Sequence, residues 1–68
     1  MDDARLAAEI RTRAQHIRDQ ARRLEARAGG LPAGAMREML AGQAKILAQG
    51  ADDLEARALA LAPAVGTA

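Results

Sequence analysis

Very few side chains in this 68-residue sequence could take part in acid–base or nucleophilic chemistry. Serine, cysteine, tyrosine and asparagine are absent, and the chain has one histidine (His16), one lysine (Lys45) and two threonines (Thr12 and Thr67). A nucleophile, its base and the group that orients the base must lie within hydrogen-bond reach, and these residues do not assemble such a set at helical spacing. The carboxylates alternate with arginines, as solvated ion pairs do. The sequence therefore predicts a protein that is not an enzyme, with no cofactor, no metal site and no small-molecule substrate.

The residues best suited to contact another molecule follow one flank of the first half of the chain. Their spacing of three and four residues places them on one stripe of a helix, and no acid follows Glu9 in that stripe. We call them the basic stripe: Arg13, His16, Gln20, Arg23 and Arg27. Arginines in such a row can contact phosphates or an acidic protein partner. The plainer interpretation of His16 is a solvated side chain on a polar flank.

The corresponding flank of the second half is apolar. Methionine adapts to irregular partners and is enriched at interfaces. Glycine within a helix costs about 1 kcal/mol relative to alanine, so Gly50 suggests that another backbone packs close to it. We expect a protein partner to contact this methionine margin: Met36, Met39, Ile46 and Gly50.

Both flanks require long helices, and a repeat of seven residues predicts two of them. Alanines occupy heptad position a, and larger apolar residues occupy position d. The a positions are Ala7, Ala14, Ala21, Ala28, Ala44, Ala51 and Ala58, and the d positions are Ile10, Ile17, Leu24, Leu31, Leu40, Leu47, Leu54 and Leu61. Alanine at a lets two antiparallel backbones approach closely, and we expect the d residues to fill the layers between them. We expect the a positions and, apart from Leu31, the d positions to form the seam of an oligomer, whereas Leu31 can cover the end of the first helix. Only Arg37 interrupts the a column.

The segment boundaries agree with a helical hairpin. Asp2 and Asp3 can cap a first helix at residues 3–28, and Gly29–Gly30 can adopt a positive φ where that helix ends. A short turn at residues 29–34 forces a second helix, at residues 35–62, to run antiparallel to the first. The predicted fold is all-α, an antiparallel helical hairpin in a single domain at residues 1–62. The remaining residues, 63–68, are expected to form a flexible tail.

The composition predicts self-association. Half of the residues are hydrophobic, but most of these are alanine, and there is no Phe, Tyr, Trp or Cys. Such a core offsets little of the ordering entropy of a small domain. We therefore expect a homo-oligomer, most simply a dimer with a coiled-coil seam that forms a four-helix bundle.

The charge pattern argues against a membrane. The N-terminus is charged from its second residue, so the sequence predicts no signal peptide, and the uncharged segment ALALAPAVGTA is too short to span a bilayer. The net charge of +1 does not by itself indicate nucleic acid or membrane binding. A cytoplasmic location is the resulting expectation.

The length, the hairpin and the small-a, large-d seam resemble the repressor-of-primer family of plasmid proteins. That family forms a dimeric four-helix bundle that binds paired RNA loops, so the resemblance implies that the basic stripe touches phosphates and base edges. The turn LPAG and the downstream segment ADDLEARA more weakly resemble the W-x-G hairpins of type VII secretion, with Pro32 at the position of the family's Trp.

The function that the sequence favours is that of an oligomerising interaction protein that binds another macromolecule as an adaptor, regulator or scaffold. Two alternatives stay open: a small regulator that binds RNA or DNA, and an export-linked hairpin.

Overall fold

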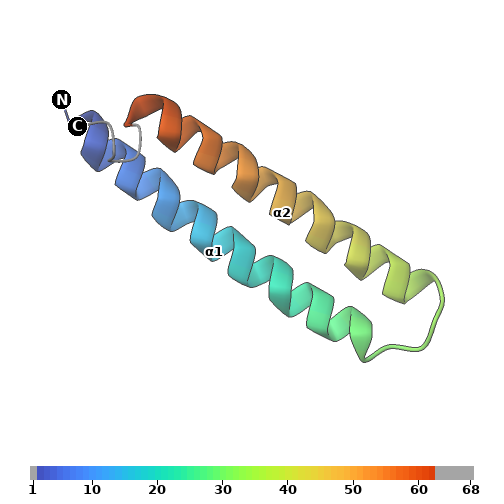
Figure 1. Ribbon diagram of the computed structural model, residues 1–68. Coiled ribbons are helices and arrows are strands. Elements are labelled where there is room, and N and C mark those ends of the chain that lie inside the picture. Colours follow the sequence, from blue (N-terminus) through green and yellow to red (C-terminus); the bar gives the residue numbers. More distant parts are fainter. Residues whose placement is uncertain (1, 63–68) are drawn as a thin grey trace.

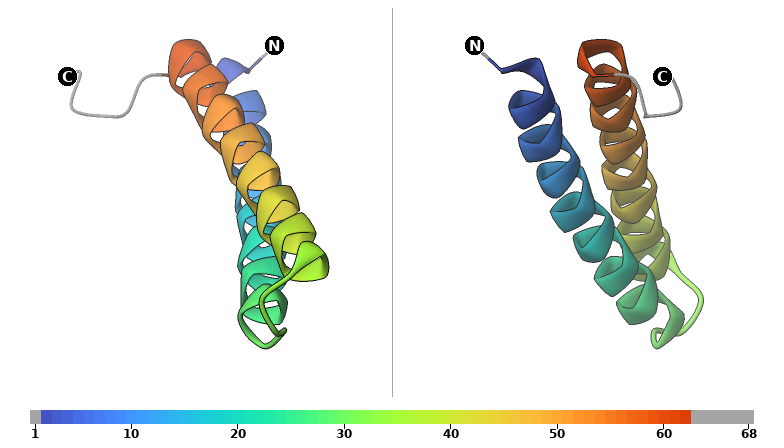
Figure 2. Two further views of the ribbon diagram at one scale, coloured as in Figure 1. Left: turned by 90° about the vertical axis from the view of Figure 1, so that its right-hand side faces the viewer. Right: turned by 60° about the vertical axis from the view of Figure 1, so that its left-hand side comes forward.

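Two long α-helices, packed side by side in opposite directions, form the molecule (Figure 1). The computed structural model describes residues 2–62. Helix α1 spans Asp3–Gly29 and helix α2 spans Ala35–Leu61. The start of α1 and the end of α2 lie at one end of the molecule and the turn lies at the other, as Figure 2 shows from two further sides. The predicted antiparallel helical hairpin is confirmed, and the expected tail at 63–68 lies outside the described residues.

The ends of the helices are held by backbone and side-chain hydrogen bonds. Asp2 caps α1, because its Oδ1 accepts hydrogen bonds from the backbone N–H groups of Ala4 at 3.1 Å and Arg5 at 3.4 Å. Gly30 ends α1 in a right-handed conformation (φ −87°), so the positive φ that the sequence allows at Gly29–Gly30 is not used. Within residues 2–62 only Gly34 has a positive φ (152°), at the position before α2, where a residue with a Cβ would be strained.

The core between the helices consists of alanine. All seven a-position alanines are at most 4% exposed, and they are the buried hydrophobic residues of the described chain. No larger side chain within residues 2–62 is fully buried. Arg37, which interrupts the a column, is exposed at the start of α2. The fully buried part of the contact between the helices is therefore made by methyl groups, the close approach that the alanine repeat predicts.

The d residues are less buried than the sequence suggests. All eight of them, from Ile10 to Leu61, keep part of their surface exposed. Helices that meet through position a direct position d to one side of the contact, because d lies on the same side of a along the whole helix. The d side chains therefore lie along one edge of the alanine core, where each is mostly covered and keeps a minor part of its surface exposed.

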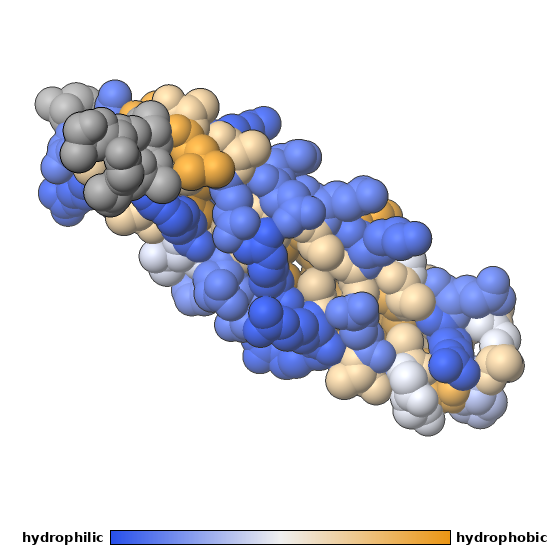
Figure 3. Space-filling view, in the orientation of Figure 1, coloured by the Kyte–Doolittle hydropathy of each residue, from blue (hydrophilic) through white to orange (hydrophobic). Residues whose placement is uncertain are grey.

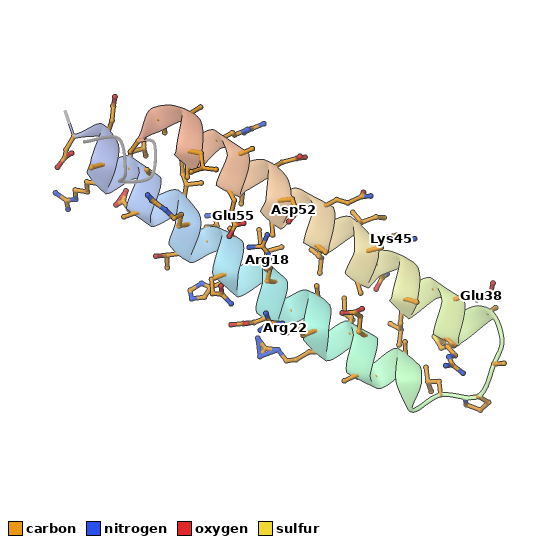
Figure 4. All side chains as sticks on the ribbon, viewed as in Figure 1. Arg18, Arg22, Glu38, Lys45, Asp52 and Glu55 are labelled. Carbon is orange, nitrogen blue, oxygen red and sulfur yellow. The ribbon has the colours of Figure 1, made fainter. Side chains whose placement is uncertain are left out.

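Arg18 joins the two helices on the other side of the alanine core (Figure 4). Its Nη2 donates to Asp52 Oδ1 at 2.5 Å and its Nη1 donates to Glu55 Oε2. A guanidinium group suits this role because its fixed, forked donors can serve two carboxylates at once. The hydrogen bond from Arg18 lowers the pKa of Glu55, and the two carboxylates raise the pKa of Arg18.

The alanine core predicts that a larger side chain there is harmful. We expect Ala51→Leu to lower the free energy of unfolding by about 1–3 kcal/mol, because the helices must separate to admit the added carbons. Urea denaturation followed by circular dichroism measures the change. The matched control is Ala56→Leu, which makes the same substitution at an exposed position of the same helix and should change stability little. Equal stability of the two variants would contradict a close-packed alanine core.

The Arg18 contact predicts a dependence of stability on acid. The lowered pKa of Glu55 means that its contribution is complete above the ordinary value of 4.5 and is lost as the pH falls through the lowered value. Wild-type stability should therefore fall more steeply on acidification than that of Glu55→Gln, as measured by urea denaturation at a series of pH values. Glu25→Gln is the control, because Glu25 is exposed and forms no ion pair within residues 2–62. If Glu25→Gln flattened the acid dependence as much as Glu55→Gln, the assignment to the Arg18 contact would be wrong.

Candidate interaction face

One broad side of the hairpin carries the d residues of both helices. The helices meet through position a, and Arg18 and Glu55, both at heptad position e, bridge them on the opposite side. The d residues from the two helices also share pockets: Leu24 with Leu47, and Leu31 with Leu40. We call this side the leucine face: Ile10, Ile17, Leu24, Leu31, Leu40, Leu47, Leu54 and Leu61.

Two neighbouring pockets hollow the leucine face along the boundary between the helices. The first has a volume of about 380 Å³ and is lined by Gln20, Arg23, Leu24, Arg27 and Leu47. The second, near the turn, has a volume of about 420 Å³ and is lined by Ala26, Arg27, Gly30, Leu31, Met36 and Leu40. Since Arg27 lines both, the two pockets are neighbours, and we refer to them together as the groove.

The basic stripe borders this groove along α1. All five of its residues are exposed, and three of them, Gln20, Arg23 and Arg27, line the first pocket. Arg13, Arg23 and Arg27 form no salt bridge within residues 2–62, in contrast to Arg18 and Arg22. The structure thus brings the stripe together as a continuous row of donors that the rest of the described chain does not occupy.

The methionine margin borders the same face along α2. Met36 is 59%, Met39 51% and Ile46 69% exposed. Met36 lines the second pocket together with Arg27, which shows that the two margins flank one face, as expected for an antiparallel pair. A Cβ added to Gly50 would meet no atom within 4 Å. The backbone that the sequence suggests close to Gly50 is therefore not supplied by α1.

The sequence analysis missed two further exposed apolar residues, Leu6 (43% exposed) and Leu59 (52% exposed). Leu6 lies seven residues before Arg13, so the heptad repeat places it on the same flank as the basic stripe and could have revealed it. Leu59 follows an a-position alanine and lies outside the columns that the repeat singles out. In the space-filling view of Figure 3, apolar residues reach the surface between hydrophilic side chains over both helices.

The described residues contain neither a candidate metal-binding cluster nor a candidate membrane span. Within residues 2–62 no three His, Cys, Asp or Glu side chains are placed to hold a metal ion. Neither helix in this range is long and apolar enough to cross a membrane. The arrangement supplies an apolar groove for packing and free guanidinium groups for hydrogen bonds to acceptors.

Comparison with known proteins adds no relative to this picture. No protein-family model, no curated protein and no solved structure matches the chain. What is shown is therefore the architecture, a hairpin of two long antiparallel helices, and its function has to be argued from its surface.

Proposed function

We propose that this protein is a non-catalytic, oligomerising helical hairpin that acts by binding another macromolecule, as an adaptor, regulator or scaffold. The observation that supports the proposal is the leucine face: the hairpin buries its alanines and leaves every large d residue partly exposed on one side. Contiguous apolar surface bordered by polar residues is typical of an interaction site. Two hairpins that pair through their leucine faces form a four-helix bundle with the d residues in its centre.

The energetics of the hairpin support association. Burial of apolar surface contributes about 25 cal/mol per Å², and a buried alanine removes little surface from water. The seven alanines are the buried apolar residues of the described chain, and the sequence has no cysteine to cross-link the two helices. A second apolar contact, through the leucine face, supplies the burial that a domain of this size needs.

The chemistry of the accessible groups agrees with a binding role. The leucine face is bordered by arginines, methionines and one histidine, and no residue in its two pockets is a nucleophile. Arginine and methionine are both enriched in protein interfaces, where they provide adaptable apolar contact and strong hydrogen-bond donors. A binding partner of the assembled oligomer can contact the exposed guanidinium groups of the basic stripe.

Association is tested by the mass of the protein in solution. We expect size-exclusion chromatography with light scattering at low micromolar concentration to give twice the mass of the chain. The physical reason is that a dimer covers the leucine face of both copies. A folded protein that stays monomeric under these conditions would rule out self-association.

Gly50 provides a substitution that tests the leucine face without disturbing the hairpin. A side chain at Gly50 meets nothing in the same chain, so Gly50→Leu leaves the monomer intact and should weaken the dimer roughly tenfold if a second backbone packs there. Gly42→Leu is the matched control, because a Cβ at Gly42 also meets no atom within 4 Å, and Gly42 lies in the same helix and faces away from the leucine face. Dissociation constants from sedimentation equilibrium compare the two. Dimer affinity that Gly50→Leu leaves unchanged would contradict a close contact at Gly50.

A second candidate function is nucleic-acid binding, and the unpaired arginines of the basic stripe favour it. Guanidinium groups that neutralise phosphates release counterions, so affinity then falls with salt. On this view Arg23→Glu with Arg27→Glu should weaken binding of single-stranded RNA and lower the salt slope by about 1.4, which corresponds to two phosphate contacts. Fluorescence anisotropy at several salt concentrations measures both quantities.

The control for that experiment reverses the same number of positive charges outside the basic stripe. Arg5→Glu with Arg22→Glu reverses two exposed arginines outside the basic stripe and should leave the slope near that of the wild type. Absence of any RNA or DNA binding by the wild type at low salt would remove nucleic acid as a partner and leave the protein-interaction function.

A further inference from the structure

The leucine face can meet a second copy in two antiparallel stackings. In one, the turns of the two copies lie at opposite ends and α1 packs on α1 of the other copy. In the other, the turns lie at the same end and α1 packs on α2 of the other copy. We propose that the occupant of the leucine face is a second copy of this chain in the same-end stacking. The inference rests on the proposed dimerisation and specifies its geometry.

The dimensions of the face suit a second copy. The molecule measures 50 × 16 × 15 Å, so the projected outline of one long side is of the same order as the ~800 Å² of surface that each partner buries in a standard interface. The leucine face runs along this side, because its residues recur every seven positions in both helices. A second hairpin has the same length and the same spacing of d residues, and it therefore covers the face along its full length.

The charges of the two margins distinguish the two stackings. The basic stripe holds three arginines that form no ion pair in the described chain, with Glu9 as the acid on its flank. Opposite-end stacking places both basic stripes along one edge of the bundle, where like charges repel. Same-end stacking places each basic stripe against the methionine margin of the other copy, whose four residues carry no charge. The two basic stripes then lie on opposite edges of the bundle, where they repel each other less.

The exposed apolar side chains favour the same arrangement. Met36, Met39 and Ile46 are each more than half exposed, and Gly50 leaves open space beside them. An arginine can lay its aliphatic stem on apolar surface while its guanidinium group stays in water. In same-end stacking the arginines of one copy cover the methionine margin of the other in this way. Opposite-end stacking also covers the methionines, but only by gathering the arginines of both copies along one edge.

The absence of cysteine from the chain permits a direct test by cross-linking. Three single-cysteine variants are compared with a short bis-maleimide reagent: Ala33→Cys in the turn, His16→Cys at the middle of α1, and Gln49→Cys on the outward side of α2. All three positions are exposed. Same-end stacking brings the two copies of position 33 together, whereas opposite-end stacking separates them by nearly the 50 Å length of the molecule and brings the two copies of position 16 together.

We expect Ala33→Cys to cross-link within the dimer roughly 100-fold faster than Gln49→Cys at micromolar protein, because the effective concentration of groups held close together is on the order of mM. His16→Cys should react no faster than Gln49→Cys. Circular dichroism and light scattering under reducing conditions establish that each variant is folded and dimeric.

The outcomes separate the orientation from the association. Rapid cross-linking at position 16 with none at position 33 would overturn the same-end stacking while leaving the dimer intact. A monomeric mass for the wild type and all three variants would overturn the proposed self-association as well. Rapid cross-linking at position 33 alone supports both.

Discussion

The contact between two columns of alanine is the interaction on which the rest of the structure depends. The side chains buried between the helices are alanine methyl groups, so the backbones approach closely there. The large residues must then lie beside the contact. Because position d lies on the same side of position a in both helices, an antiparallel pair directs all of them to one side. The close packing of the core is thus the reason that the residues of the leucine face are only partly buried.

On the side opposite the leucine face, charged side chains bridge the two helices. There Arg18 spans the helices and reaches both Asp52 and Glu55, and these charged groups border the alanine contact. No comparable bridge crosses the leucine face within residues 2–62. The hairpin is therefore polar and cross-linked by ion pairs on one side and apolar and open on the other, an asymmetry that an isolated two-helix protein does not need for its own stability.

The fold could be predicted because the heptad repeat predicts two helices with one apolar side each, and the short turn forces them to run antiparallel. The same repeat places the two margins on one side of an antiparallel pair, and Arg27 and Met36 indeed share a pocket. The partial exposure of Ile10 to Leu61 could not be predicted, because a heptad letter does not specify how the helices rotate about their axes. The Arg18–Glu55 contact joins residues 37 positions apart and depends on the register of the two helices, which the turn sequence does not determine.

The two helices share one core pattern, and the segment LEARA occurs in both, so the core cannot specify how a partner is oriented. Alanines and larger aliphatic residues recur with the same spacing in α1 and α2, and either stacking of two hairpins satisfies them equally. Only the margins differ: basic along α1, apolar along α2. In the proposed dimer, orientation is therefore decided by residues that contribute little to the stability of the hairpin. If the proposed function holds, substitutions along the margins change what the protein binds while the alanine core keeps its fold.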